Sequence, residues 1–345
     1  MALRFGVVGL GAMGRHHVRV ISEMPDVDLV AVADPSEEAR EGVERERPAT
    51  TYASSTEMFE RAKLDAVVIA VPTIHHEATA TAVLDAGLHV LIEKPLAASI
   101  EGVANILRHR GSGQVATVGH IERYNPAVLK LVELLQSGEL GRLFQVRARR
   151  TGPLPIRIQD VGVVTDLATH DLDLINYLVP GRVQSIFALT AQRIHAMHED
   201  LVTALLSFDS EVVGLLDTNW LTPVKIREMT VIGDAGMYRL DFINQDVFFY
   251  ENSANPYWNG RNGRAGVSEG NMVRFQIDRR EPLRVELEMF ASVIRGERDE
   301  KELVSLEDGA VAVSLAEAVL ESARKGIPVM PRFTDAESTS ELPVI

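Results

Sequence analysis

The stretch LRFGVVGLGAMG, residues 3–14, opens with a short apolar run and passes directly into three closely spaced glycines. A segment with helical spacing follows at His16–Met24, and a second apolar run at Leu29–Asp34 ends on an acidic residue. A strand, a glycine turn, a helix and a second strand in this order predict the first βαβ unit of a doubly wound α/β domain.

The glycine turn has the spacing G-x-G-x-x-G, and each glycine has its own mechanical reason. Gly9 permits the tight turn, Gly11 leaves room for a pyrophosphate near the backbone, and Gly14 lets the helix pack closely on the strand. The start of the helix, at Ala12 and Met13, offers free N–H groups and a partial positive charge to the phosphates. These five residues therefore form the predicted binding turn of a dinucleotide cofactor.

The acidic residue at the end of the second strand, Asp34, lies twenty positions after Gly14. A carboxylate at this place can accept hydrogen bonds from the ribose hydroxyls of the cofactor. It would also repel a 2′-phosphate, and Pro35 follows it where an arginine would suit that phosphate. The sequence therefore favours NAD over NADP.

Length and composition set the limits for the rest of the chain. The 345 residues exceed one ordinary core and predict two domains, and 46% apolar residues allow substantial cores. No apolar run of about 18 residues predicts a membrane span. The absence of cysteine excludes disulfides and thiolate-bound metals, and a net charge of −14 without a basic stripe argues against nucleic-acid binding. The first strand begins so early that no signal peptide is expected, which fits a cytoplasmic location.

Residues 1–120 alternate apolar strands with amphipathic helices, which predicts a parallel sheet with helices on both faces, a Rossmann domain. Ligands of such domains bind at the carboxyl ends of the strands. The expected strands are Arg4–Val8, Leu29–Asp34, Asp65–Ala70, His89–Ile92 and Gln114–Val118, and the expected helices are His16–Met24, Glu37–Arg45, Thr56–Arg61, Glu77–Ala86 and Ile100–His109.

Residues 121–332 have a different pattern, in which strands follow one another without helices between them. This pattern predicts an α+β domain with a large, mostly antiparallel open sheet. The expected strands are Phe144–Arg150, Val183–Ala191, Leu201–Phe208, Val212–Trp220, Arg227–Ile232, Met237–Leu240 and Asp246–Tyr250, and the expected helices are Asn125–Gln136, Val163–Leu178, Leu283–Ile294 and Leu306–Lys325. A long loop is expected at Asn252–Asn271, and a flexible tail at 333–345.

Two short motifs follow strands of the first domain at the edge where ligands bind. After Asp65–Ala70, Pro72 suits the strand end, Thr73 can cap the next helix, and His76 would lie near the cofactor or be an ordinary loop residue. After His89–Ile92, the run Glu93-Lys94-Pro95 places an ammonium group beside a buried strand. Pro95 restricts Lys94 to an extended backbone, which aims its side chain.

Lys94 has two interpretations. As a functional residue at the ligand-binding edge, its ammonium group would strengthen the field on a substrate oxygen. As an ordinary residue, it would form a surface ion pair with Glu93. The position directly after a buried strand favours the functional interpretation.

Asp166 and His170 are four positions apart, so on one helix they share a face. A carboxylate beside an imidazole orients the ring and stabilises its protonated form, as a general base near neutral pH requires. Three alternatives stay open. Asp166 can be a helix cap, the pair can be a structural hydrogen bond, and the two residues with Asp171 or Asp173 can bind a metal, although no further ligand set is evident.

A cluster of arginines flanks these motifs and can serve an anionic ligand. Arg123, Arg149, Arg150 and Arg157 can each clamp a diphosphate in bidentate fashion, or each can be an ion-pair or surface residue. An acidic chain that binds an anion must gather its cations locally, which favours a binding role for at least one of the four.

Taken together, these motifs resemble the Gfo/Idh/MocA family of sugar oxidoreductases over nearly the whole chain, including Glu286-x-x-x-Phe290 near the C-terminus. Ala168 departs from the family pattern, which has glycine two positions after the Asp. The resemblance implies that His170 takes the proton of a sugar hydroxyl, that Lys94 stabilises the same oxygen, and that Asp166 positions the hydroxyl or tunes the base. It also implies a dimer or tetramer, with the antiparallel sheet packed between subunits. The cofactor-binding residues implied are Gly9, Gly11, Ala12, Met13, Gly14, Asp34, Pro72, His76, Glu93 and Lys94.

A narrower resemblance covers residues 119–126 and 152–171, which are similar to the UDP-N-acetylglucosamine 3-dehydrogenase-like branch of the family. It implies a nucleotide-linked N-acetyl amino sugar as substrate. It also implies substrate contacts from Lys94, Arg123, Tyr124, Arg157, Asp166 and His170. The rivals are a dehydrogenase of free sugars or inositol, and a non-catalytic regulator that binds NAD or a sugar; retention of Lys94, Asp166 and His170 argues against the regulator.

Overall fold

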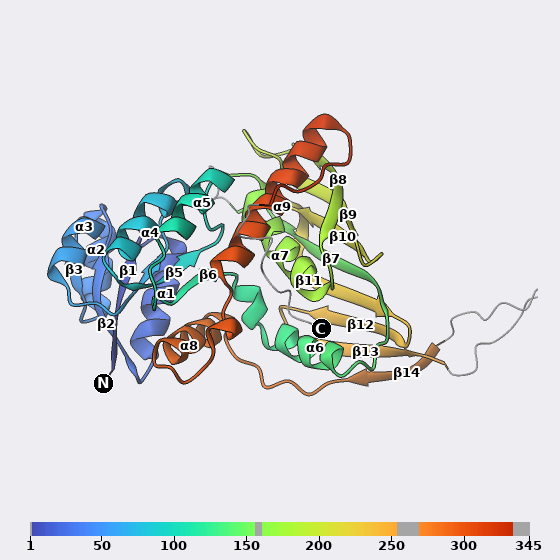
Figure 1. Ribbon diagram of the computed structural model, residues 1–345, viewed down its shortest axis with the longest axis horizontal. Coiled ribbons are helices and arrows are strands. Elements are labelled where there is room, and N and C mark those ends of the chain that lie inside the picture. The colour runs from blue at the N-terminus through green and yellow to red at the C-terminus, as the bar shows by residue number, and fades with distance from the viewer. Residues whose placement is uncertain (1, 156–160, 254–268, 334–345) are drawn as a thin grey trace, which may run out of the picture. The chain divides into compact units, whose positions relative to one another are not determined.

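The computed structural model describes residues 2–155, 161–253 and 269–333 (Figure 1). These residues divide into two compact units. Unit 1 holds the chain up to Tyr124 together with Glu281–Val313, and unit 2 holds Asn125–Arg280 and Ser314–Arg332. Each unit is described in turn.

The sheet of unit 1 has six parallel strands in the order β3-β2-β1-β4-β5-β6. The strands are short and rich in Val, Ile and Ala, and β4 is buried along its whole length, as expected for a sheet covered on both faces. This arrangement confirms the predicted Rossmann domain. The strands are β1 Leu3–Val8, β2 Val27–Ala33, β3 Thr50–Tyr52, β4 Ala66–Ile69, β5 His89–Glu93 and β6 Ala116–Gly119.

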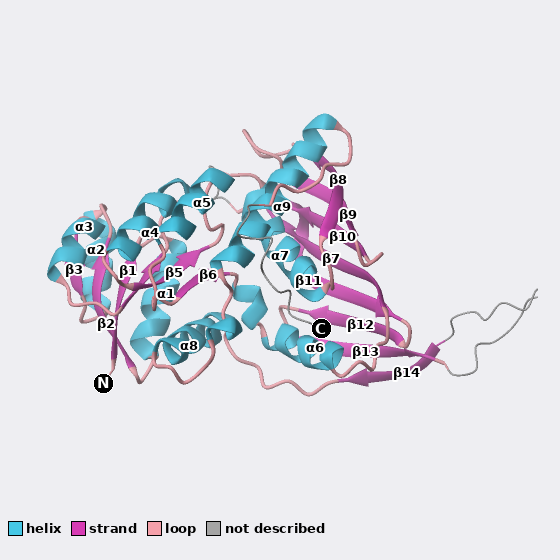
Figure 2. Cartoon of the chain, viewed as in Figure 1, coloured by secondary structure: helices cyan, strands magenta, loops and turns pink. Residues whose placement is uncertain are grey.

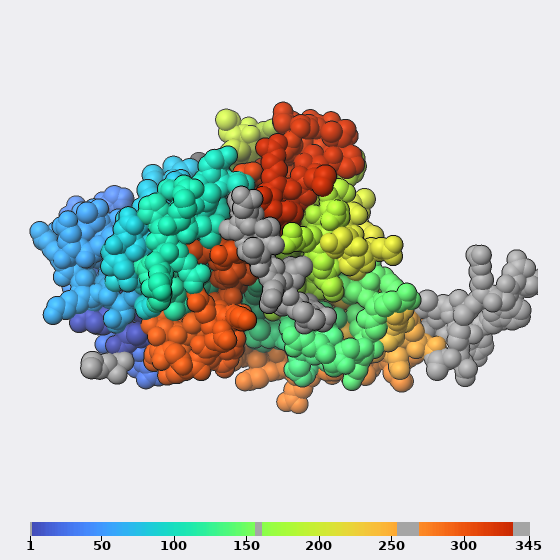
Figure 3. Space-filling view, in the orientation of Figure 1, coloured from blue at the N-terminus to red at the C-terminus, as the bar shows by residue number. Residues whose placement is uncertain are grey.

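Five α-helices connect these strands: α1 Ala12–Glu23, α2 Glu37–Glu46, α3 Ser55–Arg61, α4 His76–Asp85 and α5 Ile100–His109. Serine side chains cap three of them and accept hydrogen bonds from backbone N–H groups of the first turn. Helices α4 and α5 pack side by side, and their blue to blue-green surfaces adjoin in Figure 3. Asn105 of α5 donates a hydrogen bond of 2.8 Å to Glu77 of α4.

Two local predictions in this unit were wrong, and one strand was missed. Helix α1 begins at Ala12 instead of His16, because the glycine turn itself forms its first turn. Strand β3 was not predicted, since three residues are too few to show a period. Thr73 does not cap α4 but opens a short 3₁₀ helix, Thr73–His75, and α4 has no side-chain cap.

The helix α8, Pro282–Ile294, and the start of α9, Leu306–Lys325, complete unit 1 although they follow the second sheet in the chain. Phe290 of α8 packs edge-on against Phe5 of β1, with ring centroids 5.7 Å apart. This differs from the expected second domain at 121–332, because these apolar helix faces are buried on the strands of unit 1.

The sheet of unit 2 has eight strands in the order β14-β13-β12-β11-β7-β10-β9-β8 (Figure 2). Strands β7 and β10 pair in parallel and the other neighbours are antiparallel, which confirms the predicted mostly antiparallel sheet. The strands are β7 Leu143–Pro153, β8 Val183–Ala191, β9 Leu201–Phe208, β10 Val213–Asn219, β11 Leu221–Gly233, β12 Gly236–Asp241, β13 Asp246–Asn252 and β14 Glu269–Arg274.

Two segments of unit 2 differ from their predictions. The expected helix Val163–Leu178 consists of a π-helical turn, Val164–Ala168, followed by α7, Thr169–Leu178. The expected loop Asn252–Asn271 lies mostly outside the described residues, but its end belongs to β14, which pairs with β13. The helix α6, Pro126–Gln136, which the side chain of Asn125 caps, also belongs to this unit, as does the part of α9 from Ser314 onward. Among the helices in the described part of the chain, none combines the length and apolar character needed to cross a membrane.

Candidate functional site

The glycine turn between β1 and α1 has the geometry that the motif predicts. Gly9 has a φ of +91°, and a Cβ there would lie 2.5 Å from the carbonyl oxygen of Ala70. A Cβ on Gly14 would lie 1.8 Å from the carbonyl oxygen of Gly9, so only glycine fits where the helix meets the turn. Around Gly11, by contrast, nothing lies within 4 Å of such an atom in the described chain. The open space at Gly11 is the place where a phosphate can approach the backbone.

The start of α1 provides donors for such a phosphate. Gly11 is the N-cap residue and makes no side-chain capping bond, so the first turn, with Ala12 and Met13, has no side chain occupying its N–H groups. Gly11 and Ala12 are solvent-exposed. The residues present therefore suit the pyrophosphate of a dinucleotide.

Asp34 follows β2, next to this turn. Its Oδ2 accepts a hydrogen bond of 2.7 Å from the backbone N–H of Leu10, and its Oδ1 accepts one of 2.8 Å from that of Ser36. Two backbone donors thus orient the carboxylate. Each carboxylate oxygen can accept a second hydrogen bond, so the acceptor capacity for a ribose is retained.

Arg40 is a residue of this region that was not among the predicted site residues. Its Nη1 donates to the carbonyl oxygens of Asp34, at 2.7 Å, and of Pro35, at 3.0 Å. A guanidinium group therefore lies beside the acidic residue that was predicted to select against a 2′-phosphate. The signal in the sequence was an arginine in the second turn of α2, six positions after Asp34, where it can reach back to the strand end.

The His76 imidazole is buried, with 1% of its surface exposed. Its Nδ1 lies 2.8 Å from the carbonyl oxygen of Pro95, and its Nε2 lies 3.0 Å from that of Val71. Burial lowers the pKa of the His76 ring, and hydrogen bonds to these two carbonyl groups oppose that effect only in part. The ring bridges the segments that follow β4 and β5, which is a structural role; Pro72 is exposed beside it.

Glu93, at the end of β5, does not lie on the surface, where an ion pair with Lys94 was considered for it. The carboxylate is buried; its Oε1 lies 2.7 Å from Nε2 of His17, and its Oε2 accepts a hydrogen bond of 3.2 Å from the backbone N–H of Lys94. Burial alone would raise the pKa of Glu93, but His17 and Lys94 outweigh it and the pKa is lowered. Both carboxylate oxygens thus have partners inside unit 1, and the contact of Glu93 with the cofactor stays a prediction. Lys94 itself is half-buried.

Arg123 and Tyr124, predicted to bind substrate, are packed into unit 1. Nη1 of Arg123 lies 3.2 Å from Oδ2 of Asp308, and the hydroxyl of Tyr124 accepts a hydrogen bond of 3.2 Å from the backbone N–H of Val304. Burial raises the pKa of the Tyr124 hydroxyl. These contacts favour the ion-pair interpretation of Arg123 and a core position for Tyr124.

The two arginines of β7 also have acidic partners. Nε and Nη2 of Arg150 donate to Oδ2 and Oδ1 of Asp171 at 2.8 and 2.9 Å, and the pair is almost completely buried. Arg149 lies 3.5 Å from Asp217 and 3.8 Å from Glu228. The structure therefore supports ion pairs for these two. Arg157, the fourth candidate, lies outside the described residues.

Asp166 and His170 lie on either side of the change from π-helix to α-helix in unit 2, and both are half-buried. A π turn spaces residues differently from an α-helix, so the shared face predicted from α-helical spacing does not follow here. The loop before β9 holds the start of this turn, because Glu199 accepts hydrogen bonds from the backbone N–H groups of Val163, at 3.0 Å, and Val164, at 3.1 Å. In the described ranges, no three His, Asp or Glu side chains gather to hold a metal ion.

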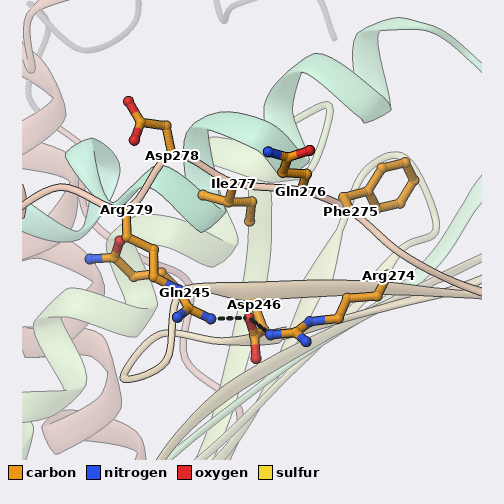
Figure 4. Close-up of a pocket in the computed structure, with 8 residues that line it drawn as sticks. All are labelled: Gln245, Asp246, Arg274, Phe275, Gln276, Ile277, Asp278 and Arg279. Atoms are coloured by element: carbon orange, nitrogen blue, oxygen red, sulfur yellow. Dashed lines mark hydrogen bonds and ion pairs between the residues drawn. The ribbon is translucent and has the colours of Figure 1, made fainter.

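A cavity of about 560 Å³ lies elsewhere in unit 2, beside β13 and β14 (Figure 4). In it, Asp246 accepts hydrogen bonds from Arg274 and Arg279 at 2.8 and 2.7 Å. None of the predicted site residues in the described chain lines this cavity, so it does not bear on the chemistry considered above. Its lining consists of Gln245, Asp246, Arg274, Phe275, Gln276, Ile277, Asp278 and Arg279.

Comparison with known proteins agrees with the fold and the motifs. Residues 3–120 match the model of an oxidoreductase family with an NAD-binding Rossmann fold, GFO_IDH_MocA, and residues 128–239 match the GFO/IDH/MocA C-terminal domain. Together the two matches span well over half of the chain.

Three relatives illustrate the range of similar proteins. The UDP-N-acetylglucosamine 3-dehydrogenase of Acidithiobacillus ferrooxidans is 27% identical over 86% of this chain and 90% of its own. Its structure superposes with a TM-score of 0.81 at 25% identity, over 94% and 99% of the two chains. The inositol 2-dehydrogenase 1 of Saccharopolyspora erythraea is 27% identical over 97% of this chain and 98% of its own.

The third, the WlbA dehydrogenase of Bordetella pertussis in complex with NADH and UDP-GlcNAcA, shares the fold with a TM-score of 0.79 at 23% identity, over 97% and 100% of the chains. The predicted family is confirmed by these matches. The chain belongs to the Gfo/Idh/MocA family of oxidoreductases and carries the family's NAD-binding Rossmann domain.

Proposed function

We propose that this oxidoreductase transfers a hydride from a secondary hydroxyl of a UDP-linked N-acetyl amino sugar, at C3, to NAD. The observation that carries the proposal is the likeness to UDP-N-acetylglucosamine 3-dehydrogenase, which extends over nearly the full length of both chains in sequence and in structure. The segments 119–126 and 152–171 support the same substrate class.

The cofactor would be held by unit 1. The open space at Gly11 and the N–H groups at the start of α1 suit the pyrophosphate, and the oriented carboxylate of Asp34 suits the ribose hydroxyls. NAD supplies the hydride acceptor. Asp34 favours NAD over NADP by like-charge repulsion, although Arg40 lies close enough to reduce that preference.

Three side chains would carry the chemistry. In the proposal, His170 accepts the proton of the reacting hydroxyl as general base, and Asp166 positions that hydroxyl or tunes the base. Lys94 donates a hydrogen bond to the same oxygen and stabilises the charge that develops there. The protein supplies position and electrostatics, and three polar side chains suffice for that task.

A second candidate function, inositol dehydrogenase, is favoured by one specific observation. The inositol 2-dehydrogenase relative is as identical as the nucleotide-sugar relative and covers slightly more of both chains. Both substrates present a secondary hydroxyl on a six-membered ring, so the same three catalytic side chains would serve either.

A turnover assay with a panel of substrates distinguishes the two candidate functions from each other and from a regulator. UDP-N-acetylglucosamine, its uronic acid form, myo-inositol and free glucose are offered with NAD or NADP, and formation of the reduced nicotinamide is followed by absorbance. The proposal expects reduction with a UDP-sugar and NAD. Reduction only with inositol would move the assignment to the second candidate, and tight NAD binding without any turnover would favour a regulator.

The proposal includes a homodimer or homotetramer built on the sheet of unit 2. Several large apolar side chains on its strands are exposed, which a second copy would cover. Analytical ultracentrifugation measures the mass, and a monomer would contradict this part of the proposal. The exposed side chains are Phe144, Leu189, Leu205, Val213, Met272 and Val273.

A further inference from the structure

A buried polar pair of unit 1 joins two segments that the proposed function uses separately. His17 lies on α1, one turn after Gly14, and its side chain is fully buried. Its Nε2 lies 2.7 Å from Oε1 of Glu93, the last residue of β5. The pair therefore connects the helix that begins at the cofactor turn to the strand that leads to Lys94.

The other oxygen of the same carboxylate holds the Lys94 peptide. Oε2 of Glu93 accepts a hydrogen bond of 3.2 Å from the backbone N–H of Lys94. A Cβ on Gly119, at the end of β6, would lie 3.2 Å from this oxygen and 3.3 Å from the Cα of Glu93, so β6 leaves the carboxylate little room to turn. One side chain thus links His17 on one side to the Lys94 backbone on the other.

A third titratable side chain lies near this pair. Glu286, on α8, is 1% exposed, and neither of its oxygens has a hydrogen-bond partner in residues 2–155, 161–253 and 269–333. Burial, and after it the charge of Glu93, raises the pKa of Glu286 well above its usual value. The surroundings of Glu286 therefore favour its protonated form, whereas His17 and Lys94 favour the charged form of Glu93. Nε2 of His17, 2.7 Å from Oε1 of Glu93, holds this carboxylate in place.

Stability alone does not account for such a pair. Burying two polar groups is costly in desolvation, and apolar side chains of similar volume often stabilise a core as well or better. A directional contact of this kind does hold two backbone segments at a set distance. In catalysis by position, a displacement of about 1 Å can lower a rate by about 10²-fold.

We propose that His17 is a positioning residue that acts on Lys94 through Glu93, so that the cofactor-binding helix and the catalytic ammonium group keep one relative placement. The inference rests on the proposed function, in which Lys94 contacts the reacting oxygen. His17 itself touches neither cofactor nor substrate. Removal of His17 should therefore impair the chemical step through Lys94 and leave binding of the nicotinamide cofactor largely intact.

A double-mutant cycle tests this dependence on Lys94 in the full-length protein, with the substrate that turns over in the panel. His17→Ala should lower kcat by about 10- to 100-fold and change the Kd of NADH by less than about threefold. In a Lys94→Met background, which has only residual turnover, His17→Ala should cause no further loss. An equal loss in both backgrounds, or an equal loss in kcat and NADH affinity, would overturn the inference.

Two further variants separate positioning from simple structural damage. His17→Gln keeps an N–H donor near the position of Nε2 and should retain most of the natural kcat. This variant can be measured even if His17→Ala does not fold. Val20→Ala, a matched truncation at a fully buried position of the same helix, should lower the melting temperature but leave kcat within about twofold. The inference is contradicted if the kcat of His17→Gln is no higher than that of His17→Ala. It is also contradicted if Val20→Ala lowers kcat as much as His17→Ala does.

A substrate-free measurement keeps the inference distinct from the proposed function. Amide hydrogen exchange at Lys94 reports the hydrogen bond to Glu93 in the folded protein, and it should be at least about tenfold faster in the His17 variants than in Val20→Ala. If no substrate is turned over, the proposed function fails while this measurement still decides the link. Unchanged exchange at Lys94 would refute the link even if the enzyme is active.

Discussion

The cofactor turn of unit 1 and the Asp166–His170 segment of unit 2 are built in opposite ways. In the turn, backbone requirements of neighbouring residues decide the structure, since Gly9 needs a positive φ and Gly14 tolerates no side chain. In the Asp166–His170 segment, the backbone structure depends on side chains that are distant in the sequence. Glu199 holds the start of the π turn, and Arg150 of β7 holds Asp171, the residue after His170. The first site can therefore be recognised from a short motif, and the second depends on the completed fold.

The largest loss of stability is expected when Asp171, beside His170, loses its ion-pair partner Arg150 on β7. Arg150→Ala would leave Asp171 buried without its bidentate partner and should lower the free energy of unfolding by about 3–5 kcal/mol. Arg149→Ala, next to it on β7, removes a partly exposed ion pair and should cost about 0–1 kcal/mol. Denaturant unfolding of both variants measures the difference, and equal losses would contradict the contrast drawn here.

This contrast also explains how much could be predicted. The glycine turn, Asp34 at a strand end and both sheets followed from local patterns, and the fold and family were confirmed. The π turn at Val164–Ala168 was not foreseen, because its spacing depends on contacts from a loop some 35 positions away in the chain. Two further contacts also form only in the folded chain. One joins His17 to Glu93, and the other is the hydrogen bond from Arg40 to the carbonyl oxygen of Asp34. The catalytic roles of Lys94, Asp166 and His170 stay predictions.

The next effect concerns Lys94. Lys94→Ala should lower turnover by at least about 10²-fold, or about 2.7 kcal/mol of transition-state stabilisation, because the developing charge loses its donor. NADH affinity should stay nearly unchanged. Steady-state kinetics and fluorescence titration with NADH measure the two quantities, with the exposed Lys301→Ala as control. Unaltered turnover would remove Lys94 from the mechanism.

The two glycines of the cofactor turn should separate binding from folding. Gly11→Ala places a methyl group in open space, so the melting temperature should hold, but NADH affinity should fall by at least about tenfold because the pyrophosphate needs that space. Gly14→Ala should lower the melting temperature, since its Cβ would meet the carbonyl oxygen of Gly9. Calorimetry and NADH titration distinguish the two. The account is contradicted if Gly11→Ala binds NADH normally.

A smaller effect is expected for cofactor choice. Asp34→Ala should lower the affinity for NAD several-fold more than the affinity for NADP. The substitution removes both the carboxylate that accepts from the ribose and the charge that repels a 2′-phosphate. Arg40→Ala is the companion variant and should weaken NADP more than NAD. Titrations with both cofactors give the ratio, and parallel losses of NAD and NADP in Asp34→Ala would refute the ribose contact.

The last prediction concerns a slope of the free energy of unfolding with pH. The pKa of Glu286 is raised in the folded protein, so the folded state keeps a proton that the unfolded state releases above about pH 4.5. This contribution to stability is complete at low pH and is lost as pH rises toward the folded pKa. Glu286→Gln should remove this loss of stability at rising pH. The difference in the free energy of unfolding between the variant and the natural chain should therefore grow by up to about 1.4 kcal/mol per unit of increasing pH. Urea unfolding between pH 5 and 7 measures it; parallel curves would show that Glu286 is not buried as a neutral acid.

In the proposed reaction, a C3 hydrogen of a UDP-linked amino sugar moves directly to the nicotinamide bound by unit 1. The most direct measurement uses UDP-N-acetylglucosamine deuterated at C3 with NAD, followed by mass spectrometry of the reduced cofactor. We expect one deuterium in the NADH and a slower rate than with the unlabelled sugar. Reduced cofactor without deuterium, or no reduction with this sugar while inositol is oxidised, would contradict it.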